Sequence, residues 1–246
     1  MAELTLERGA MLSDPMEGHT AKAFDAALTA LRLHAVSMGG LVIDQVSTAV
    51  RALLDADANL AQTVLARESQ VNDLESTVDR EAFELIALHQ PVAGDLRMAT
   101  AVSRMTVELE RAGDESKKIA RFAGRMAGGE PQGPVRAVAR YLQHMAELTT
   151  GMLRDAVRAL DESNAELAER VRARDSELDA EFAAALRQLL TLAMQDQRYL
   201  GVTIDTVFAL KGLERIGDHA KNIAEQVVFI ASGRDMRHAK KRQAKA

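Results

Sequence analysis

The first long segment of the chain places apolar side chains three or four residues apart. Between about residues 20 and 54 the pattern runs through Phe24, Leu28, Leu31, Ala35, Met38 and Val42. This spacing gathers apolar groups on one face of an α-helix. Gly39-Gly40 lies within this pattern, and each Gly lowers helix stability by about 1 kcal/mol relative to Ala. We therefore expect the pair to allow a close helix crossing there. Residues 1–18 are expected to be irregular.

The same periodicity continues in five further segments. The predicted helices are 59–89, 95–127, 135–161, 163–195 and 198–232. Asp55-Ala-Asp57 predicts a capped turn, and Asp95 is expected to cap the third helix. Gln90-Pro91 should end the second, because the residue before proline disfavours helical geometry. Residues 128–134, rich in Gly and Pro, predict a linker.

The chain contains an internal duplication. Leu109–Ala120 and Leu213–Ala224 share eight of twelve residues at an offset of 104, and segments 49–72 and 156–179 share twelve of twenty-four at an offset of 107. We therefore predict an all-α fold, a tandem duplication of two antiparallel three-helix bundles with six long helices. The predicted bundles span 19–127 and 135–233. The basic tail, 234–246, is expected to be frayed and solvated.

Each copy of the repeat carries two acidic side chains four residues apart. Glu214 and Asp218 form one pair, and Glu110 and Asp114 form the other. Residues at this spacing lie on one helix face, where like charges repel slightly. A solvated face neutralised by nearby Arg and Lys is the common explanation. A metal ion that takes several carboxylate oxygens is the alternative, and the recurrence of the pair favours it.

The second and third helices of each half should bring further acidic groups to these pairs. Because these helices are antiparallel and joined by a short turn, groups equally far from the turn can meet at one height. In the second half Asp175 and Asp179 would then face Glu214 and Asp218. Four converging carboxylates need a counter-ion, which either Arg and Lys or a metal such as Mg, Ca, Mn or ferric iron would supply. His219 should point about 100° away from Asp218 around the helix, so we do not expect it to be a ligand.

The first half differs from the second at one position. Its facing pair is Glu68 and Asn72, so a neutral amide stands where the second half has a carboxylate. The first site should be weaker or occupied differently, although Glu75 on the same helix could compensate. The candidate metal ligands are Glu68, Asn72, Glu110, Asp114, Asp175, Asp179, Glu214 and Asp218.

Composition narrows the class of protein. The 246 residues include no Cys, which excludes disulfides and thiolate metal sites. A formal net charge of −5 argues against nucleic acid as the main partner. No uninterrupted apolar run has the length of a membrane-spanning helix, and the charged first twenty residues do not resemble a signal peptide. We therefore expect a cytoplasmic protein.

Motifs of common enzymes are missing from the sequence. It has no Gly-rich phosphate-binding or dinucleotide-binding loop, no GxSxG and no HExxH. It also lacks the Glu-x-x-His pair that ferritin-like di-iron bundles use. We therefore expect a protein that is not an enzyme.

Several short stretches together resemble the PhoU family, from about residue 20 to His238. They are Met38-Gly-Gly40, Gln90-Pro-Val-Ala-Gly-Asp-Leu-Arg97, Leu109-Glu-Arg-Ala-Gly-Asp114, Asp196-Gln-Arg198 and Leu213-Glu-Arg-Ile-Gly-Asp-His219. The resemblance implies two tandem three-helix bundles whose acidic motif binds metal clusters in some members. Carried over, that motif falls on Glu110/Asp114, Asp175/Asp179 and Glu214/Asp218, and only partly on Glu68/Asn72.

The resemblance also implies a regulatory function. It predicts a negative regulator of phosphate uptake that links the phosphate ABC transporter ATPase to the sensor histidine kinase of the phosphate regulon. It further implies a homo-oligomer, with a dimer favoured, that reaches the membrane only through partners. The expected cofactor is a divalent or trivalent metal ion (Mg, Mn, Fe or Zn). The alternatives are a metal-binding or metalloenzyme helical bundle and a purely structural helical protein with a solvated acidic stripe.

Overall fold

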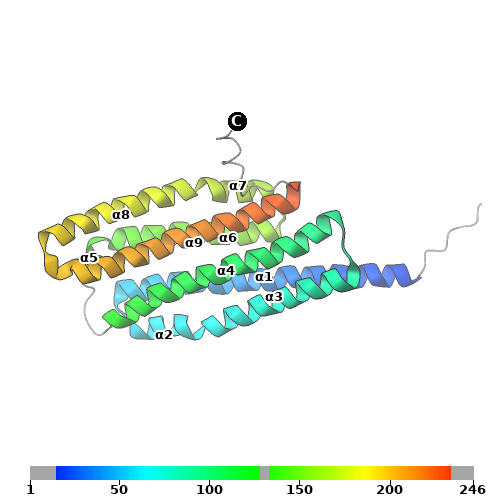
Figure 1. The fold of residues 1–246 in the computed structure, drawn as a ribbon, viewed down its shortest axis with the longest axis horizontal. Coiled ribbons are helices and arrows are strands. Elements are labelled where there is room, and N and C mark those ends of the chain that lie inside the picture. The colour runs from blue at the N-terminus through cyan, green and yellow to red at the C-terminus, as the bar shows by residue number, and fades with distance from the viewer. Residues whose placement is uncertain (1–14, 128–132, 234–246) are drawn as a thin grey trace, which may run out of the picture.

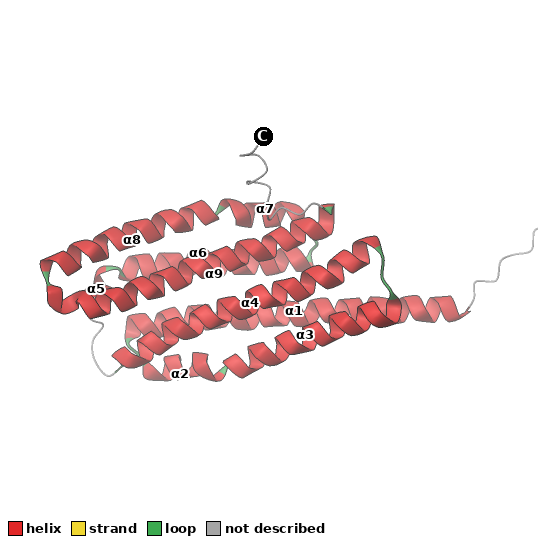
Figure 2. Ribbon diagram, viewed as in Figure 1, coloured by secondary structure: helices red, strands yellow, loops and turns green. Residues whose placement is uncertain are grey.

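A computed structural model describes residues 15–127 and 133–233, which form helices joined by short turns and contain no strand (Figure 2). The elements are α1 (Pro15–Asp55), α2 (Ala58–Ala66), α3 (Glu68–His89), α4 (Ala93–Met126), α5 (Gly133–Ala137), α6 (Ala139–Asp161), α7 (Ala165–Ala173), α8 (Asp175–Gln195), the 3₁₀ turn η1 (Gln197–Tyr199) and α9 (Leu200–Ser232). The predicted all-α class is confirmed.

The helices lie along the long axis of the molecule as two three-helix bundles (Figure 1). The first bundle contains α1, α2–α3 and α4, and the second contains α6, α7–α8 and α9. In Figure 1, α2 and α3 lie along one edge and α7 and α8 along the other. Between these edges α4 packs against α9 and α1 packs against α6, so the two bundles share one continuous apolar core.

Helix α1 is a central element of this core. A stretch of α1 within Lys22–Asp55 has a mean hydropathy of 1.5, so by length and composition alone the helix could cross a membrane. In this fold the helix packs against α3, α4 and α6 and buries Leu31, Met38 and Val42 completely.

The glycine pair of α1 only partly behaves as predicted. A Cβ on Gly39 would lie 2.5 Å from Cγ2 of Val157 on α6, so the close crossing is confirmed at this residue. Gly40 is exposed and has no neighbouring atom within 4 Å of a Cβ. The prediction is wrong for Gly40, because this residue faces away from the crossing.

Three of the predicted helices are each divided in two. The segment 59–89 breaks at Arg67, 163–195 breaks at Arg174, and 135–161 breaks at Val138. Arg67 and Arg174 are related by the offset of 107. At each of these two, the backbone amide donates to the carbonyl oxygen three residues earlier, at 3.2 Å, which tightens the last helical turn.

The predicted cap at Asp57 and the predicted helix end at Gln90 are confirmed, whereas the predicted cap at Asp95 is wrong. Asp57 accepts hydrogen bonds from the amides of Asn59 and Leu60 at 2.7 and 3.2 Å, and Gln90 ends α3 in a left-handed conformation. Asp95 is not the cap, because α4 begins two residues earlier with Val92 as its N-cap. Asp95 lies instead in the first turn, where a negative charge is favourable.

The ends of the predicted segments lie partly outside the described residues. Helix α1 begins at Pro15, earlier than predicted, and proline is well suited to a first helical turn. Of the predicted linker, 133–134 begin α5, and 128–132 fall outside the described residues. Residues 1–14 and the predicted tail 234–246 also lie outside them.

Candidate functional site

The four candidate residues of the first half line one small cavity between α3 and α4. Glu68 and Asn72 come from α3, and Glu110 and Asp114 come from α4. The cavity has a volume of about 10 Å³, which is close to the space that a single water molecule needs. Its size suits one small ion or one water.

A lysine already balances part of the negative charge in this cavity. The Lys117 Nζ contacts Oε1 of Glu68 and lies 2.7 Å from Oδ1 of Asp114. Burial alone would lower the pKa of Lys117, but the hydrogen bonds to Asp114 and Glu68 outweigh it and raise that pKa. The ammonium group therefore stays charged between the two carboxylates.

Glu75 extends the acidic cluster, as the sequence suggested. Burial, followed by the nearby charge of Glu110, raises the pKa of Glu75. Burial, followed by the charge of Asp114, likewise raises the pKa of Glu110. These carboxylates therefore lie close enough to repel one another.

In the second half, three of the candidates lie near enough to the fourth, Asp218, to affect its pKa. Partial desolvation, then the charges of Glu214, Asp175 and Asp179, raises the pKa of Asp218, although its side chain still reaches solvent. The Lys221 Nζ contacts Oδ2 of Asp175. Lys221 is related to Lys117 by the offset of 104, so each acidic face carries its own lysine at the matched position.

The oxygen donors of the first acidic face, which is formed by Glu68, Asn72, Glu110 and Asp114, are of the kind that a hard cation binds. In this structure they do not surround a common point. Within 15–127 and 133–233, no three Asp, Glu or His side chains are positioned to hold a common metal ion. Gln45 of α1 lines the same cavity, and its buried Oε1 lacks a hydrogen-bond partner among the described residues. Hard cations bind amide and carboxylate oxygens, so these groups could hold one if Lys117 moved aside.

The structure also shows which residues lie near the faces without belonging to them. The Nδ1 atom of His219 lies 2.7 Å from Oε2 of Glu108 on α4, so the imidazole is engaged between the halves and away from Asp218.

Gln45 is a residue that sequence reasoning missed. Its one signal is the spacing of three residues from Val42, which puts a polar side chain on the buried face of α1.

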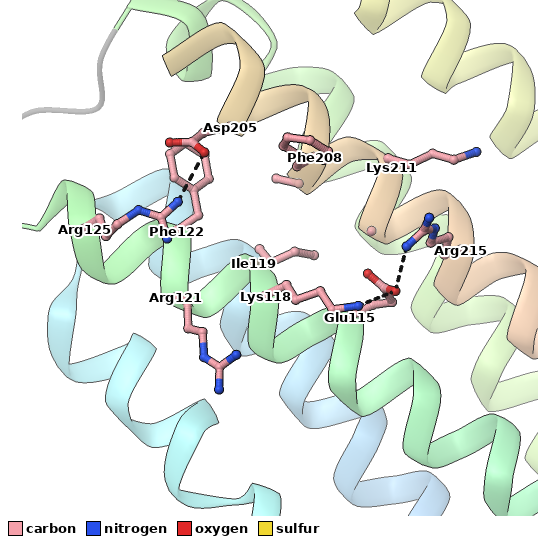
Figure 3. Close-up of a pocket in the computed structure, with 12 residues that line it drawn as sticks. Glu115, Lys118, Ile119, Arg121, Phe122, Arg125, Asp205, Phe208, Lys211 and Arg215 are labelled. Atoms are coloured by element: carbon pink, nitrogen blue, oxygen red, sulfur yellow. Dashed lines mark hydrogen bonds and ion pairs between the residues drawn. The ribbon is translucent and has the colours of Figure 1, made fainter. Parts of the chain in front are cut away.

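A second feature, a basic groove, lies between α4 and α9 (Figure 3). Its volume is about 330 Å³. Glu115 accepts hydrogen bonds from Lys118 at 2.8 Å and from Arg215 at 3.2 Å, and Phe208 is 69% exposed. The basic residues that line it are Lys118, Arg121, Arg125, Lys211 and Arg215. Such a groove can hold an anionic or aromatic group, and the sequence did not predict it because its residues come from two distant helices.

Comparison with known proteins accounts for both halves of the chain. The PhoU domain matches twice, over residues 35–123 and over residues 142–227, so each bundle holds one copy. The chain belongs to the PhoU family. The resemblance in the short motifs is thereby confirmed.

Relatives match over nearly the whole length. A Pseudomonas aeruginosa protein named phosphate-specific transport system accessory protein PhoU homolog is 40% identical and covers 92% of each chain. A Pseudomonas putida protein of the same name is 40% identical over 89% of this chain and 85% of its own. The Escherichia coli phosphate-specific transport system accessory protein PhoU is 33% identical over 89% of this chain and 90% of its own.

Solved PhoU structures share the fold. The crystal structure of PhoU from Pseudomonas aeruginosa superposes with a TM-score of 0.79 at 40% identity, covering 86% of this chain and all of that one. The phosphate transport system regulatory protein PhoU from Streptococcus pneumoniae gives a TM-score of 0.78 at 25% identity, covering 87% of this chain and 99% of its own. The arrangement of helices is therefore that of the family.

Proposed function

We propose that this chain is an accessory protein of phosphate-specific transport that acts as an adaptor without catalysing a reaction. It links the ATPase of the phosphate ABC transporter to the sensor histidine kinase of the phosphate regulon, and it keeps that regulon silent when phosphate is plentiful. The observation that carries the proposal is the match of both bundles to proteins named as accessory proteins of this transport system. The kinase and the ATPase follow from the family resemblance seen in the sequence.

Metal binding on the two acidic faces is part of the proposal. Each face gathers oxygen donors from two adjacent helices. Lys117 balances part of the charge of the first face, and Lys211 and Lys221 balance part of the charge of the second. A divalent or trivalent ion (Mg, Mn, Fe or Zn) would replace these lysines and change the charge that each face presents to a partner. The residues assigned to this role are Glu68, Asn72, Glu110, Asp114, Asp175, Asp179, Glu214 and Asp218.

Location and assembly complete the proposal. The chain works in the cytoplasm as a homo-oligomer, with a dimer favoured, and it meets the membrane through the transporter and the kinase. Helix α1 is a core helix in this proposal and does not cross the membrane itself, because its apolar side is buried against α3, α4 and α6.

Co-purification tests the adaptor directly. The transporter and the kinase are solubilised in mild detergent from cells lacking this protein, mixed with the tagged full-length chain, and recovered through the tag. We expect both the ATPase and the kinase to be retained. A kinase captured through a tag on the transporter should appear only when the chain is added. Recovery of neither partner, or of the kinase without the chain, would contradict the adaptor.

A further inference from the structure

The two acidic faces differ in the side chains that lie beneath them. In the first half the Gln45 Oε1 lies 3.1 Å from the point where a Cβ on Gly113 would stand, so this glycine lets the amide approach α4. In the second half Leu178 is the nearest neighbour of the equivalent point at the matched Gly217, and the Cε of Met152 lies 3.9 Å from that point. Positions 45 and 152 are related by the offset of 107. The duplication has thus placed an amide under one face and a thioether under the other.

The buried Gln45 amide oxygen destabilises the fold unless a hydrogen-bond donor or a cation binds it. Gln45 is 2% exposed, and Oε1 has no hydrogen-bond partner in the part of the chain that the structure describes. A buried acceptor without a partner is unfavourable, because it has lost its hydrogen bonds to water and gained none in the protein. Lys117 does not relieve it, because its hydrogen bonds go to Glu68 and Asp114. Gln45 lines the cavity that those two carboxylates also line.

We propose that the first acidic face holds a single divalent, oxygen-preferring cation of the Mg²⁺ or Mn²⁺ kind, with the Gln45 amide oxygen as a buried ligand. The inference rests on the metal binding proposed above and adds a ligand that the acidic motif does not contain. The cavity of about 10 Å³ admits one small ion. Two amides, Gln45 and Asn72, share this face with its carboxylates, and neutral oxygen donors are ordinary ligands of such cations.

The same comparison distinguishes the second face. There the two amides are replaced by Met152 and Asp179, so its candidate ligands are all carboxylates. Lys211 contacts Glu214 and Lys221 contacts Asp175, so two lysines balance part of its charge. The duplicated faces therefore differ in the donor groups that they would offer to a cation.

Titration with Mn²⁺ tests the ligand. The full-length chain carries Asp175→Asn and Asp218→Asn to silence the second face, is stripped with chelator, and is titrated while free Mn²⁺ is followed by electron paramagnetic resonance. Gln45→Met installs the side chain that the second half uses at this position. We expect Mn²⁺ binding to weaken by about tenfold or more, since even residues that only support a ligand change affinity by 10–100-fold.

Thermal unfolding of the same samples separates a lost ligand from a damaged fold. Replacing an unpaired buried amide by an apolar group is nearly neutral or stabilising. The metal-free Tm of Gln45→Met should therefore equal or exceed that of its parent, while the rise in Tm on adding Mn²⁺ should shrink. Met152→Gln, the matched control, should leave Mn²⁺ binding to the first face unchanged.

Two outcomes would overturn the inference. The first removes only the Gln45 ligand, and the second also removes the proposed metal site. If Gln45→Met binds Mn²⁺ like its parent while Glu110→Gln with Asp114→Asn abolishes binding, the face binds metal without Gln45. If the parent with the silenced second face binds no Mn²⁺, the first face is a lysine-neutralised surface, and the proposed metal site fails with the ligand. The adaptor function would then still be judged by co-purification.

Discussion

Two neighbouring glycines of α1 should respond in opposite ways to the same substitution. Gly40→Ala adds a methyl group in open space and removes the entropic penalty of glycine, so the free energy of unfolding should rise by about 0.5–1 kcal/mol. Gly39→Ala drives a Cβ into Val157 and should lower it by about 1–3 kcal/mol. Urea denaturation of the two variants measures both changes. Shifts of the same sign would contradict the helix crossing at Gly39.

Glu108 should give the protein a specific sensitivity to acid. Burial alone would raise the pKa of Glu108, but hydrogen bonds from His219 and Asn222 lower it below its ordinary value of 4.5. A carboxylate whose pKa is lowered by folding stabilises the protein above the unfolded pKa, and this stabilisation is lost as pH falls through the folded pKa.

Glu108→Gln removes this contribution. The variant should be less stable than the parent at neutral pH by about 1.5–3 kcal/mol, the range for hydrogen bonds to a charged group. Its stability should also fall less steeply below pH 4.5. Urea unfolding at a series of pH values follows both effects, and parallel curves for parent and variant would contradict the role given to Glu108.

The placement of the acidic residues was predictable where the sequence repeats itself. Glu110 and Asp114, and Glu214 and Asp218, stood out because each pair recurs in register, and the structure places each pair beside the acidic residues expected to face it. Gln45 did not stand out, because one polar residue on an apolar face has no periodic signal. Its surroundings come from α3 and α4, which only the folded chain brings to α1.

At the scale of elements, the duplication extends to turn conformations. Ala56 and Ser163, related by the offset of 107, have positive φ angles of 48° and 51°. The next residues, Asp57 and Asn164, accept amide hydrogen bonds at the starts of α2 and α7. Each half therefore enters its second helix through the same capped turn.

Removal of either cap should cost a similar amount of stability. Asp57→Ala and Asn164→Ala should each lower the free energy of unfolding by about 1 kcal/mol, within the range of about 0.5–2 kcal/mol for such caps. Ala56→Gly is the control with the opposite sign, because glycine adopts the left-handed conformation without steric cost. Guanidinium denaturation compares the three, and a neutral effect at both caps would contradict the matched turns.

Helix positions were predictable, but the breaks within them were not. The apolar periodicity continues through Arg67 and Arg174, and neither position has a proline or glycine to mark a break. The breaks arise from a tightened turn in each second helix. They matter for the acidic faces, because Glu68 and Asp175 are the first residues of α3 and α8.

At the scale of the whole molecule, the two bundles should unfold together. Their cores are continuous, since α4 packs along α9 and α1 along α6, and Glu108 reaches His219 across the same boundary. Differential scanning calorimetry should show one transition whose calorimetric and van't Hoff enthalpies agree. Two resolved transitions would mean that the bundles are independent domains.

Sequence reasoning predicted the two bundles but not how they are joined. The internal repeat and the helical periodicity defined three helices in each half, and the solved PhoU structures share that fold. The shared core and the basic groove depend on the packing of α4 against α9, which no local pattern encodes. The family assignment came from short motifs spread over the chain, and the domain matches confirm it.

The central claim is that this chain silences the phosphate regulon when phosphate is plentiful. The most direct test measures a phosphate-regulon reporter in phosphate-replete cells from which the gene for this chain has been deleted. The account predicts that the reporter is expressed in the deletion strain and silent again when the full-length chain is restored. A reporter that stays silent in the deletion strain, with normal transporter and kinase levels, would contradict the account.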